Sequence, residues 1–320
     1  MKTKDIVILG GTGFVGGHLA HRLAAEGHRL RLLTRDPERR RDLRVLPTAE
    51  LIAADVHDPR ELVRHMEGAD AVINLVGILN ERGDSGTGFR RVHVELAEKV
   101  VRAMTETGVR RLLHMSALNA DAQHGPSHYL RTKGQAEDLV HAAAGLEVTS
   151  FRPSVIFGPG DSFFTRFARL LRLAPGIFPL AMGRARFAPV YVEDVVHCYA
   201  TALADPHTIG RRYDLCGPRV YTLKELVEFT ARVIGVRRKV ISLGPVLSAL
   251  QANVLEYVPG KPFSRDNYRS LQVDAVCREP FPDIFGITPQ GIEAVVPQYL
   301  GGRRMRARYQ EFRRLARHEA

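Results

Sequence analysis

The feature that most constrains the fold is a group of glycines directly after an apolar stretch near the start of the chain. Residues 6–9 are aliphatic and predict a buried β-strand, and an amphipathic run over residues 14–25 predicts a helix. Between them, Gly10, Gly13 and Gly16 are spaced G-x-x-G-x-x-G. Glycines in such a pattern allow a tight turn, close approach of backbone to a pyrophosphate, and close packing of helix on strand. Because a helix N-terminus favours phosphates, the stretch predicts a dinucleotide site formed by Gly10, Thr12, Gly13, Phe14, Val15 and Gly16.

Strand-like and helix-like segments alternate through the first half of the chain. Further strands are predicted over residues 29–33, 51–54, 71–75, 112–115 and 148–151, with helical patterns over 92–107 and 129–144 among them. This alternation predicts an α/β fold with right-handed crossovers and a Rossmann-type, doubly wound parallel sheet. Beyond residue 157 the pattern breaks up. We therefore predict an NAD(P)-binding domain from residues 1–157 plus 187–208 and a smaller interleaved substrate or partner domain from 158–186 plus 209–320.

Charge narrows the range of partners. The formal net charge is +11, mostly from arginine, which favours anionic partners such as dinucleotide phosphates or an acidic lipid surface. The chain has no nucleic-acid-binding motif and its aromatic residues are not interleaved with basic runs, so nucleic acid is not expected.

The cysteines and the hydropathy bear on location. Cys198, Cys216 and Cys277 lie far apart and predict buried thiols in a reducing compartment. Neither they nor the histidines have metal-ligand spacing, so no metal is predicted. No apolar run is long enough to span a bilayer, and the first residues lack a signal-peptide pattern. We expect a cytoplasmic protein, with peripheral contact at the inner face of the membrane left open.

The end of the second predicted strand bears on the choice of cofactor. Where an NAD-preferring fold places an acid for the ribose 2′-hydroxyl, this chain has Thr34 followed by Arg35. A guanidinium can pair a 2′-phosphate and lie on the adenine face, so NADP(H) is favoured. Asp36, one position later, keeps NAD(H) open. The structural alternative is that the arginines of residues 35–40 form a solvated helix start.

Two more strand ends are predicted to contact the cofactor. Asp55 and Val56 end the third strand, where an acid can accept from the adenine amine. Leu75, Val76 and Gly77 follow the fourth strand, where glycine lets the backbone pass close to the ribose. Either could instead be an ordinary strand exit.

A serine, a tyrosine and a lysine form the predicted catalytic group. Ser116 follows the fifth strand, at the edge where such sheets bind ligands. Tyr129 and Lys133 are four residues apart and share one face of a predicted helix. A nearby ammonium lowers a tyrosine pKa from its usual value of about 10, and a serine hydroxyl can orient a substrate oxygen. The alternative is a surface Tyr–Lys pair.

Taken in order, these motifs resemble the extended short-chain dehydrogenase/reductases of the NAD-dependent epimerase/dehydratase superfamily. The resemblance is carried by the glycine triplet, Ser116, residues 129–133, Arg152–Gly158 and Pro189–Val195. It implies that Pro153, Ser154 and Val155 approach the nicotinamide and that Tyr129 is the acid/base.

Other stretches are similar to a narrower group, the nucleotide-binding accessory subunit of respiratory complex I (alpha subcomplex subunit 9 type) and its bacterial relatives. They are residues 109–120, 129–133, 259–267 and 270–274. His93 falls where sugar epimerases usually offer an asparagine, which argues against a nucleotide-sugar substrate.

Three amphipathic segments lie in the second half. The first has a broad apolar face flanked by arginines; the apolar residues are Phe163, Phe164, Phe167, Leu170 and Leu171, and the arginines are Arg166, Arg169 and Arg172. It is predicted to be a lid over an apolar substrate, a helix on a membrane surface, or a core helix with a basic solvated face. A second stripe is predicted to be core, and consists of Val246, Leu247, Leu250, Val254 and Val258. Residues 301–320 carry seven Arg against two Glu and fit either docking to an anionic surface or partner, or a terminal helix packed on its own domain.

Three functions follow as hypotheses. The first is an NADP(H)-dependent oxidoreductase acting on a hydrophobic carbonyl/alcohol pair linked to quinone or respiratory metabolism. In it Tyr129 is the general acid/base, Lys133 lowers the tyrosine pKa and orients the nicotinamide ribose, and Ser116 polarises the substrate oxygen. The second is a non-catalytic nucleotide-binding accessory or assembly factor of NADH:quinone oxidoreductase. The third is a nucleotide-sugar epimerase/dehydratase. We expect an enzyme with a small apolar substrate, and a respiratory complex or anionic membrane as candidate partner.

Overall fold

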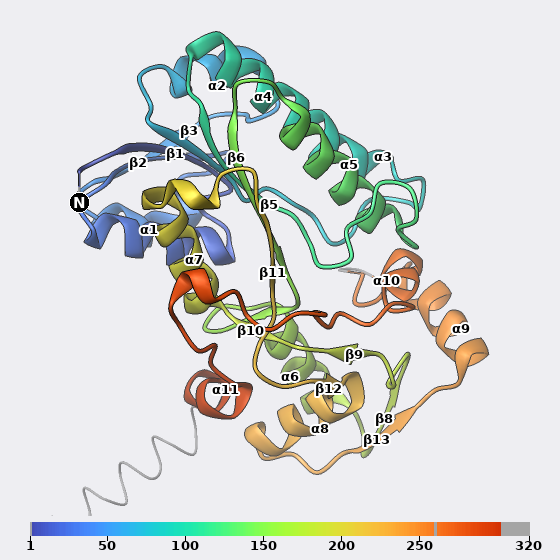
Figure 1. Ribbon diagram of the computed structural model, residues 1–320. Helices are drawn as coiled ribbons and strands as arrows, with labels where there is room; N and C mark the ends of the chain where they lie inside the picture. The colour runs from blue at the N-terminus through green and yellow to red at the C-terminus, as the bar shows by residue number, and fades with distance from the viewer. Residues whose placement is uncertain (1, 259–260, 302–320) are drawn as a thin grey trace, which may run out of the picture.

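A seven-stranded parallel sheet organises the computed structural model, which describes residues 2–258 and 261–301 (Figure 1). The strand order is β11-β6-β5-β4-β1-β2-β3, so the order reverses at β1, which lies between β2 and β4. The strands are β1 (Asp5–Leu9), β2 (Arg29–Thr34), β3 (Ala49–Ala53), β4 (Ala71–Asn74), β5 (Arg111–Met115), β6 (Glu147–Pro153) and β11 (Arg212–Leu215). The predicted doubly wound α/β sheet is confirmed, and its reversal point is where such sheets bind ligands.

Both faces of the sheet are covered by helices because its strands are apolar on both sides (Figure 1). Successive residues of β1 point to opposite faces, so Ile6 and Ile8 join one core and Val7 and Leu9 the other. Helices α1 (Phe14–Ala25) and α7 (Val192–Ala204) cover the first face. Helices α2 (Pro59–Met66), α4 (Leu96–Thr107) and α5 (His128–Ala142) cover the second.

Short helical segments complete this half of the molecule. A 3₁₀ segment, η1 (Glu38–Val45), follows β2, and η3 (Pro206–Thr208) precedes β11. The helix predicted from residue 92 begins earlier, as α3 (Thr87–Arg90), and passes through one π-helical segment, η2 (Arg91–Glu95), before α4. A π-helical turn within a longer helix is frequently found at a functional site.

The second half builds a smaller lobe below the carboxyl edge of the sheet (Figure 1). Its helices are α6 (Phe163–Leu173), α8 (Leu223–Ile234) and α11 (Ile292–Leu300). The 3₁₀ turn η4 (Asp283–Phe285) packs instead on α7, in the core of the central sheet. Three two-stranded sheets pair β7 (Ile156–Phe157) with β10 (Val190–Tyr191), β9 (Arg186–Phe187) with β12 (Tyr221–Thr222), and β8 (Ile177–Leu180) with β13 (Lys239–Ser242). Phe164 and Leu171 of α6 are fully buried in this lobe, so the core interpretation of residues 163–173 is confirmed.

Helix α9 (Pro245–Leu255) contradicts the sequence prediction. Four of the five residues of the predicted core stripe, Val246, Leu247, Leu250 and Val254, are more than half exposed, and Val258 is also exposed. The helix instead buries Ser248 and Ala252. Helix α10 (Arg265–Ser270) follows and packs against both α9 and α5.

Two more expectations need correction. Residues 212–215 were predicted to belong to the smaller domain, but as β11 they pair with β6 and form an edge of the central sheet. The cysteines were predicted to be free thiols, but Cys216 and Cys277 form a disulfide, which ties the end of β11 to residues beyond α10. The cysteines therefore no longer support the expectation of a reducing compartment. Cys198 is a free, buried thiol as predicted.

Membrane spanning can be assessed for the described residues alone. Within residues 2–258 and 261–301, no helix combines the length and the apolar character that a membrane span needs. The basic segment predicted over 301–320 lies, after Gly301, outside the described residues.

Candidate active site

The glycine turn between β1 and α1 has the shape that the sequence predicts. Gly10 has a φ of +77°, which favours glycine, and Gly13 is the N-cap of α1. A Cβ on Gly16 would collide with the backbone of Gly10 and Gly11, so α1 packs directly on the turn. A Cβ on Gly10 would lie 3.2 Å from Val76 N, which brings the exit of β4 against the same turn. This cradle at the N-terminus of α1 fits the pyrophosphate of a dinucleotide.

An arginine that the sequence analysis did not single out lies on this cradle. Arg40 Nη1 donates to Thr12 O at 2.7 Å and Gly13 O at 3.2 Å. A Cβ on Gly17 would lie 2.6 Å from Arg40 Nη2, so this glycine leaves room for the guanidinium. Arg35, which was predicted to bind a 2′-phosphate, is exposed at the end of β2. The basic run 39–41 was the available signal, but sequence spacing does not reveal which of its members turns inward.

The other predicted cofactor residues lie at the carboxyl ends of their strands. Thr34 is buried and accepts a hydrogen bond from Thr12 Oγ1 at 3.2 Å. Asp55 is exposed and its carboxylate accepts from His57 N at 2.9 Å. Ser154, after β6, donates to Ala275 O at 2.8 Å, which joins this strand end to the chain beyond α10. Thus Thr34, Asp55–Val56, Leu75–Gly77 and Pro153–Val155 end at one edge of the sheet.

The predicted catalytic residues meet where β5 ends against α5. Lys133 is buried, and its Nζ donates to Met115 O at 2.9 Å. A Cβ on Gly77 would lie 3.1 Å from that Nζ, so Lys133 adjoins the strand end predicted to hold the ribose. Ser116 Oγ donates to Glu137 Oε2 at 2.6 Å. The serine proton is therefore already engaged, and the predicted role of Ser116 as a donor to substrate requires this bond to break.

Tyr129 lies one turn before Lys133 on α5, beside two aromatic rings. Its ring centroid is 5.6 Å from that of His93 and 6.1 Å from that of Phe89, both edge-on. Burial raises the pKa of Tyr129 to about 12 and lowers the pKa of Lys133 to about 8. The direction for Tyr129 is opposite to the sequence expectation, because loss of hydration on burial disfavours the charged phenolate. Tyr129 is thus a neutral phenol at pH near 7, able to donate a proton.

Glu137 is a second residue that the sequence analysis missed. It is fully buried, and besides Ser116 it accepts from Arg152 Nε at 2.9 Å and pairs with Arg212 Nε at 3.0 Å. It lies one turn after Lys133, so the face Tyr129–Lys133–Glu137 continues the predicted spacing. That continued spacing was a usable signal. The cluster fixes the end of β5 to β6 and β11.

His93, on the π-helical segment η2, is held as a neutral ring. Its Nδ1 is 2.9 Å from Thr132 Oγ1 and its Nε2 is 3.2 Å from Ile78 N. The Thr132 hydroxyl donates to His128 O, so the network assigns the hydrogen to Nδ1 and leaves Nε2 as acceptor. Burial and, to a lesser extent, the charge of Lys133 lower the His93 pKa to about 2. His93 therefore positions its neighbours instead of transferring protons.

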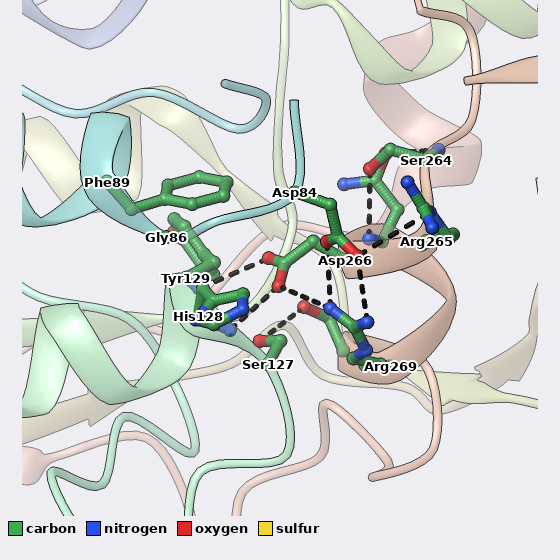
Figure 2. Close-up of polar contacts among 12 residues, drawn as sticks. Asp84, Gly86, Phe89, Ser127, His128, Tyr129, Ser264, Arg265, Asp266 and Arg269 are labelled. Carbon is green, nitrogen blue, oxygen red and sulfur yellow. Dashed lines mark hydrogen bonds and ion pairs between the residues drawn. The ribbon is translucent and has the colours of Figure 1, made fainter. Parts of the chain in front are cut away.

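Asp266 and Arg269 of α10, which we call the α10 latch, hold the start of α5, the helix that carries Tyr129 and Lys133 (Figure 2). The carboxylate of Asp266 accepts from His128 N at 2.7 Å and Tyr129 N at 3.1 Å, and so caps α5. Arg269 binds Asp84 with two hydrogen bonds of 2.8 and 2.9 Å. Asp84, His128 and Asp266 come close enough to suggest a cation site, but these bonds already engage both carboxylates. The absence of a metal stays a prediction.

The fold and this edge of the sheet define a dinucleotide-binding α/β protein. Residues 6–216 match the family model described as the NAD dependent epimerase/dehydratase family. The chain belongs to that family.

Several relatives narrow the resemblance. The chain is 28% identical to the mitochondrial NADH-ubiquinone oxidoreductase 40 kDa subunit of Neurospora crassa over 309 residues, which cover 94% of this chain and 80% of that protein. It is 32% identical to a ceramide reductase of Caulobacter vibrioides over 74% of this chain and 73% of that protein. It is also 31% identical to the complex I alpha subcomplex subunit 9 of Arabidopsis thaliana, over 77% of this chain and 62% of that protein. The predicted similarity to the subunit 9 group is confirmed.

Solved structures share the fold. MoeE5 in complex with UDP-glucuronic acid and NAD superposes with a TM-score of 0.72 at 20% identity, over 95% of this chain and 99% of that one. Pal from Bacillus thuringiensis gives a TM-score of 0.74 at 16% identity, over 93% and 99%. At such identities the likeness establishes the fold alone.

Proposed function

We propose that the protein is an NAD(P)H-dependent reductase that converts an apolar carbonyl compound to the alcohol. The observation that carries the proposal is the neutral Tyr129 phenol, one helical turn from the buried Lys133, at the carboxyl edge of a dinucleotide-binding sheet. A neutral phenol suits reduction, because reduction needs a proton donor for the carbonyl oxygen. Two relatives are named as reductases, of ceramide and of a furanylmethyl phosphate.

The residues divide the work as follows. The bound cofactor supplies a hydride for the carbonyl carbon. The Gly10–Gly16 cradle holds its diphosphate, Arg40 braces that cradle by donating to Thr12 O, and Lys133, beside Gly77, orients the nicotinamide ribose. Tyr129 gives its phenolic proton to the carbonyl oxygen, and the resulting phenolate is stabilised by the Lys133 ammonium and regains a proton from water.

NADPH is the proposed cofactor, with NADH as the alternative. Exposed Arg35 follows the strand end where a 2′-phosphate would lie, and Thr34 occupies the position of the usual acid. Asp36, which kept NAD(H) open, accepts from Glu38 N at 3.1 Å and Arg39 N at 3.3 Å, so one of its carboxylate oxygens caps the following turn. That engagement makes Asp36 a weaker partner for a ribose diol.

The proposed substrate is an apolar carbonyl compound of quinone or respiratory metabolism. The support for it is that the relatives include subunits of NADH-ubiquinone oxidoreductase; the Phe89 and His93 rings beside Tyr129 are themselves buried. Such substrates partition into membranes, so we further propose a cytoplasmic protein that works peripherally at the inner face of the membrane.

The test is turnover by Tyr129→Phe. NADPH oxidation is followed with a short-chain ubiquinone and with a long-chain ketone as probes. We expect the variant to lose about a hundredfold or more in kcat, the usual contribution of a positioned proton donor, while it binds NADPH as wild type does. Tyr213→Phe, on edge strand β11, is the matched control. Equal turnover by wild type and Tyr129→Phe would refute the catalytic role.

A non-catalytic accessory subunit is the second candidate. It is favoured by the match of 94% of this chain to a subunit of a respiratory complex. A nucleotide that co-purifies tightly, and that no probe oxidises or reduces, would support it over the reductase. Mass spectrometry of the co-purified nucleotide would also decide between NADP(H) and NAD(H).

A further inference from the structure

Helix α9 turns two of its polar residues, Ser248 and Gln251, toward the protein, whereas its third, Asn253, is exposed among the apolar residues of the outward side. Ser248 Oγ accepts from Met182 N at 3.1 Å and donates to Leu243 O at 3.2 Å. Gln251 accepts from Ala181 N at 2.9 Å and donates to Pro179 O at 3.2 Å. These two side chains satisfy backbone groups at the end of β8, and they fix which side of the helix faces inward.

The opposite side of α9 is left to solvent. Val246 is 81% exposed, Leu250 57% and Val254 59%, and Tyr257 just after the helix is 81% exposed. In Figure 1 the helix lies at the margin of the molecule. Its hydrogen bond to Pro179 O sets it beside the β8–β13 pair, where Ile177 and Ile241 are also exposed. We call this surface the α9 face; it comprises Ile177, Ile241, Val246, Leu247, Leu250, Val254, Tyr257 and Val258.

The α9 face is uncharged at its centre and basic at one border. Residues 240–255 contain no charged side chain. The next residue, Glu256, is buried and paired with Arg265 and Lys261, so its charge is compensated. At the other border, exposed cations lie at the start of β13 and the end of α6, two segments that Arg238 joins by donating to Leu171 O at 3.0 Å. These cations are Arg172, Arg237 and Lys239.

We infer that the α9 face docks on an anionic phospholipid membrane. Exposed aliphatic residues gathered on one helix and on the strand pair beside it mark an interaction surface, and exposed cations at its border complement a negative one. Lipid suits this combination, because apolar side chains enter the acyl boundary while arginine and lysine remain among the headgroups. The inference rests on the proposed peripheral location, not on the chemistry of Tyr129.

The assignment differs from the segments that the sequence favoured for membrane contact. Helix α6 is committed to the core of the lobe. The α9 face, which the sequence predicted to be core, takes its place. The α9 face is also connected to the candidate site. Glu256, at the C-terminus of α9, pairs with Arg265 of α10, and Asp266 of α10 accepts a hydrogen bond from Tyr129 N at the start of α5.

Flotation of the full-length protein tests the inference. Vesicles of phosphatidylglycerol and phosphatidylcholine in equal parts are compared with phosphatidylcholine alone, without cofactor or substrate. We expect wild type to float with the anionic vesicles and the double variant Leu250→Gln/Val254→Gln to bind about tenfold more weakly, because two side chains no longer enter the acyl boundary. Val45→Gln/Val220→Gln, which changes two exposed valines elsewhere, should bind as wild type.

A second variant separates the charge contribution. Arg237→Gln/Lys239→Gln should weaken binding to anionic vesicles about fivefold per cation and reduce its dependence on salt. NADPH binding by calorimetry should be the same for all variants. A wild-type protein that turns over substrate but does not float with the anionic vesicles would overturn this inference and leave the proposed chemistry of Tyr129 standing. Unchanged flotation of Leu250→Gln/Val254→Gln would overturn it too. So would a wild-type dimer that this variant converts to monomer in the absence of lipid, because the face would then bind a second copy.

Discussion

Helices α5 and α9 break the usual distribution of residues in opposite directions. Helix α5 buries a lysine and a glutamate, whereas α9 exposes valines and leucines. Lys133 donates to a backbone carbonyl of β5. Glu137 accepts from Ser116 and pairs with Arg212 of β11, so hydrogen bonds and an ion pair compensate the burial of both charges. On α9 the side chains of Ser248 and Gln251 bond inward. Apart from the exposed Asn253, the outward side is apolar, and the described residues offer nothing to cover it. The buried charges of α5 form part of the candidate site within the chain, whereas the exposed apolar residues of α9 imply a partner outside it.

The largest effect should come from removing the buried charge of α5. Glu137→Ala leaves Arg152, Arg212 and Ser116 without their shared acceptor. We expect the free energy of unfolding to fall by about 3–5 kcal/mol, the range for breaking a buried ion pair. Urea unfolding followed by circular dichroism measures it.

The neighbouring acid gives a matched control. Asp138 also pairs with Arg212, at 2.9 Å, but its side chain is 59% exposed. Asp138→Ala should cost less than about 1 kcal/mol, as exposed ion pairs do. If both substitutions cost the same, the burial of Glu137 does not have the energetic role assigned to it.

A smaller effect should appear as pH dependence beside Lys133. Burial, reinforced by the charge of Lys133, lowers the pKa of His114 to about 3, and both ring nitrogens are without a hydrogen-bond partner among the described residues. An unfolded histidine titrates near about 6.5, so below that pH the unfolded state binds the proton and the folded state does not. The stability contributed by the neutral ring is therefore complete above about pH 6.5 and is lost as the pH falls.

His114→Leu should remove the contribution of this one histidine to the loss of stability at low pH. Each such histidine costs about 1.4 kcal/mol per pH unit at most, so the drop in unfolding free energy from about pH 6 to about pH 5 should shrink by about 1 kcal/mol. His93, which is also neutral, continues to contribute in the variant. His124→Leu, at an exposed position, should leave the drop unchanged. An identical drop in wild type and His114→Leu would contradict a neutral His114.

Local spacing predicted the sheet and the outline of its edge. Strands β1 to β6 could be placed because buried parallel strands are continuous apolar runs, and the glycine turn because only glycine fits its geometry. The spacing of Tyr129 and Lys133 predicted a shared helix face correctly. It could not predict the direction of the Tyr129 pKa, because desolvation depends on residues such as Phe89 that tertiary packing brings alongside.

Contacts between residues far apart in the chain could not be predicted from the sequence. Arg40 reaches the cradle, and Cys216 meets Cys277, only because the chain folds back on itself. The apolar residues of α6 and α9 predict two similar helices. The two helices differ in the residues opposite the apolar side. On α6 these residues are arginines, whereas on α9 they include Ser248 and Gln251, which hydrogen-bond to backbone groups of another segment. Helical periodicity shows which residues share a side, but not which side the protein covers.

The smallest expected effect tests the α9 side of the comparison. Leu250→Gln alters a leucine that is already largely in water in the folded state, so the unfolding free energy should change by no more than about 0.5 kcal/mol. Leu171→Gln, the same change at a fully buried position of α6, should cost several times more, because it leaves a polar group in an apolar core. Urea unfolding of both variants in detergent-free buffer gives the comparison. A large loss for Leu250→Gln would mean that α9 is packed in solution, and the contrast with α5 would then disappear.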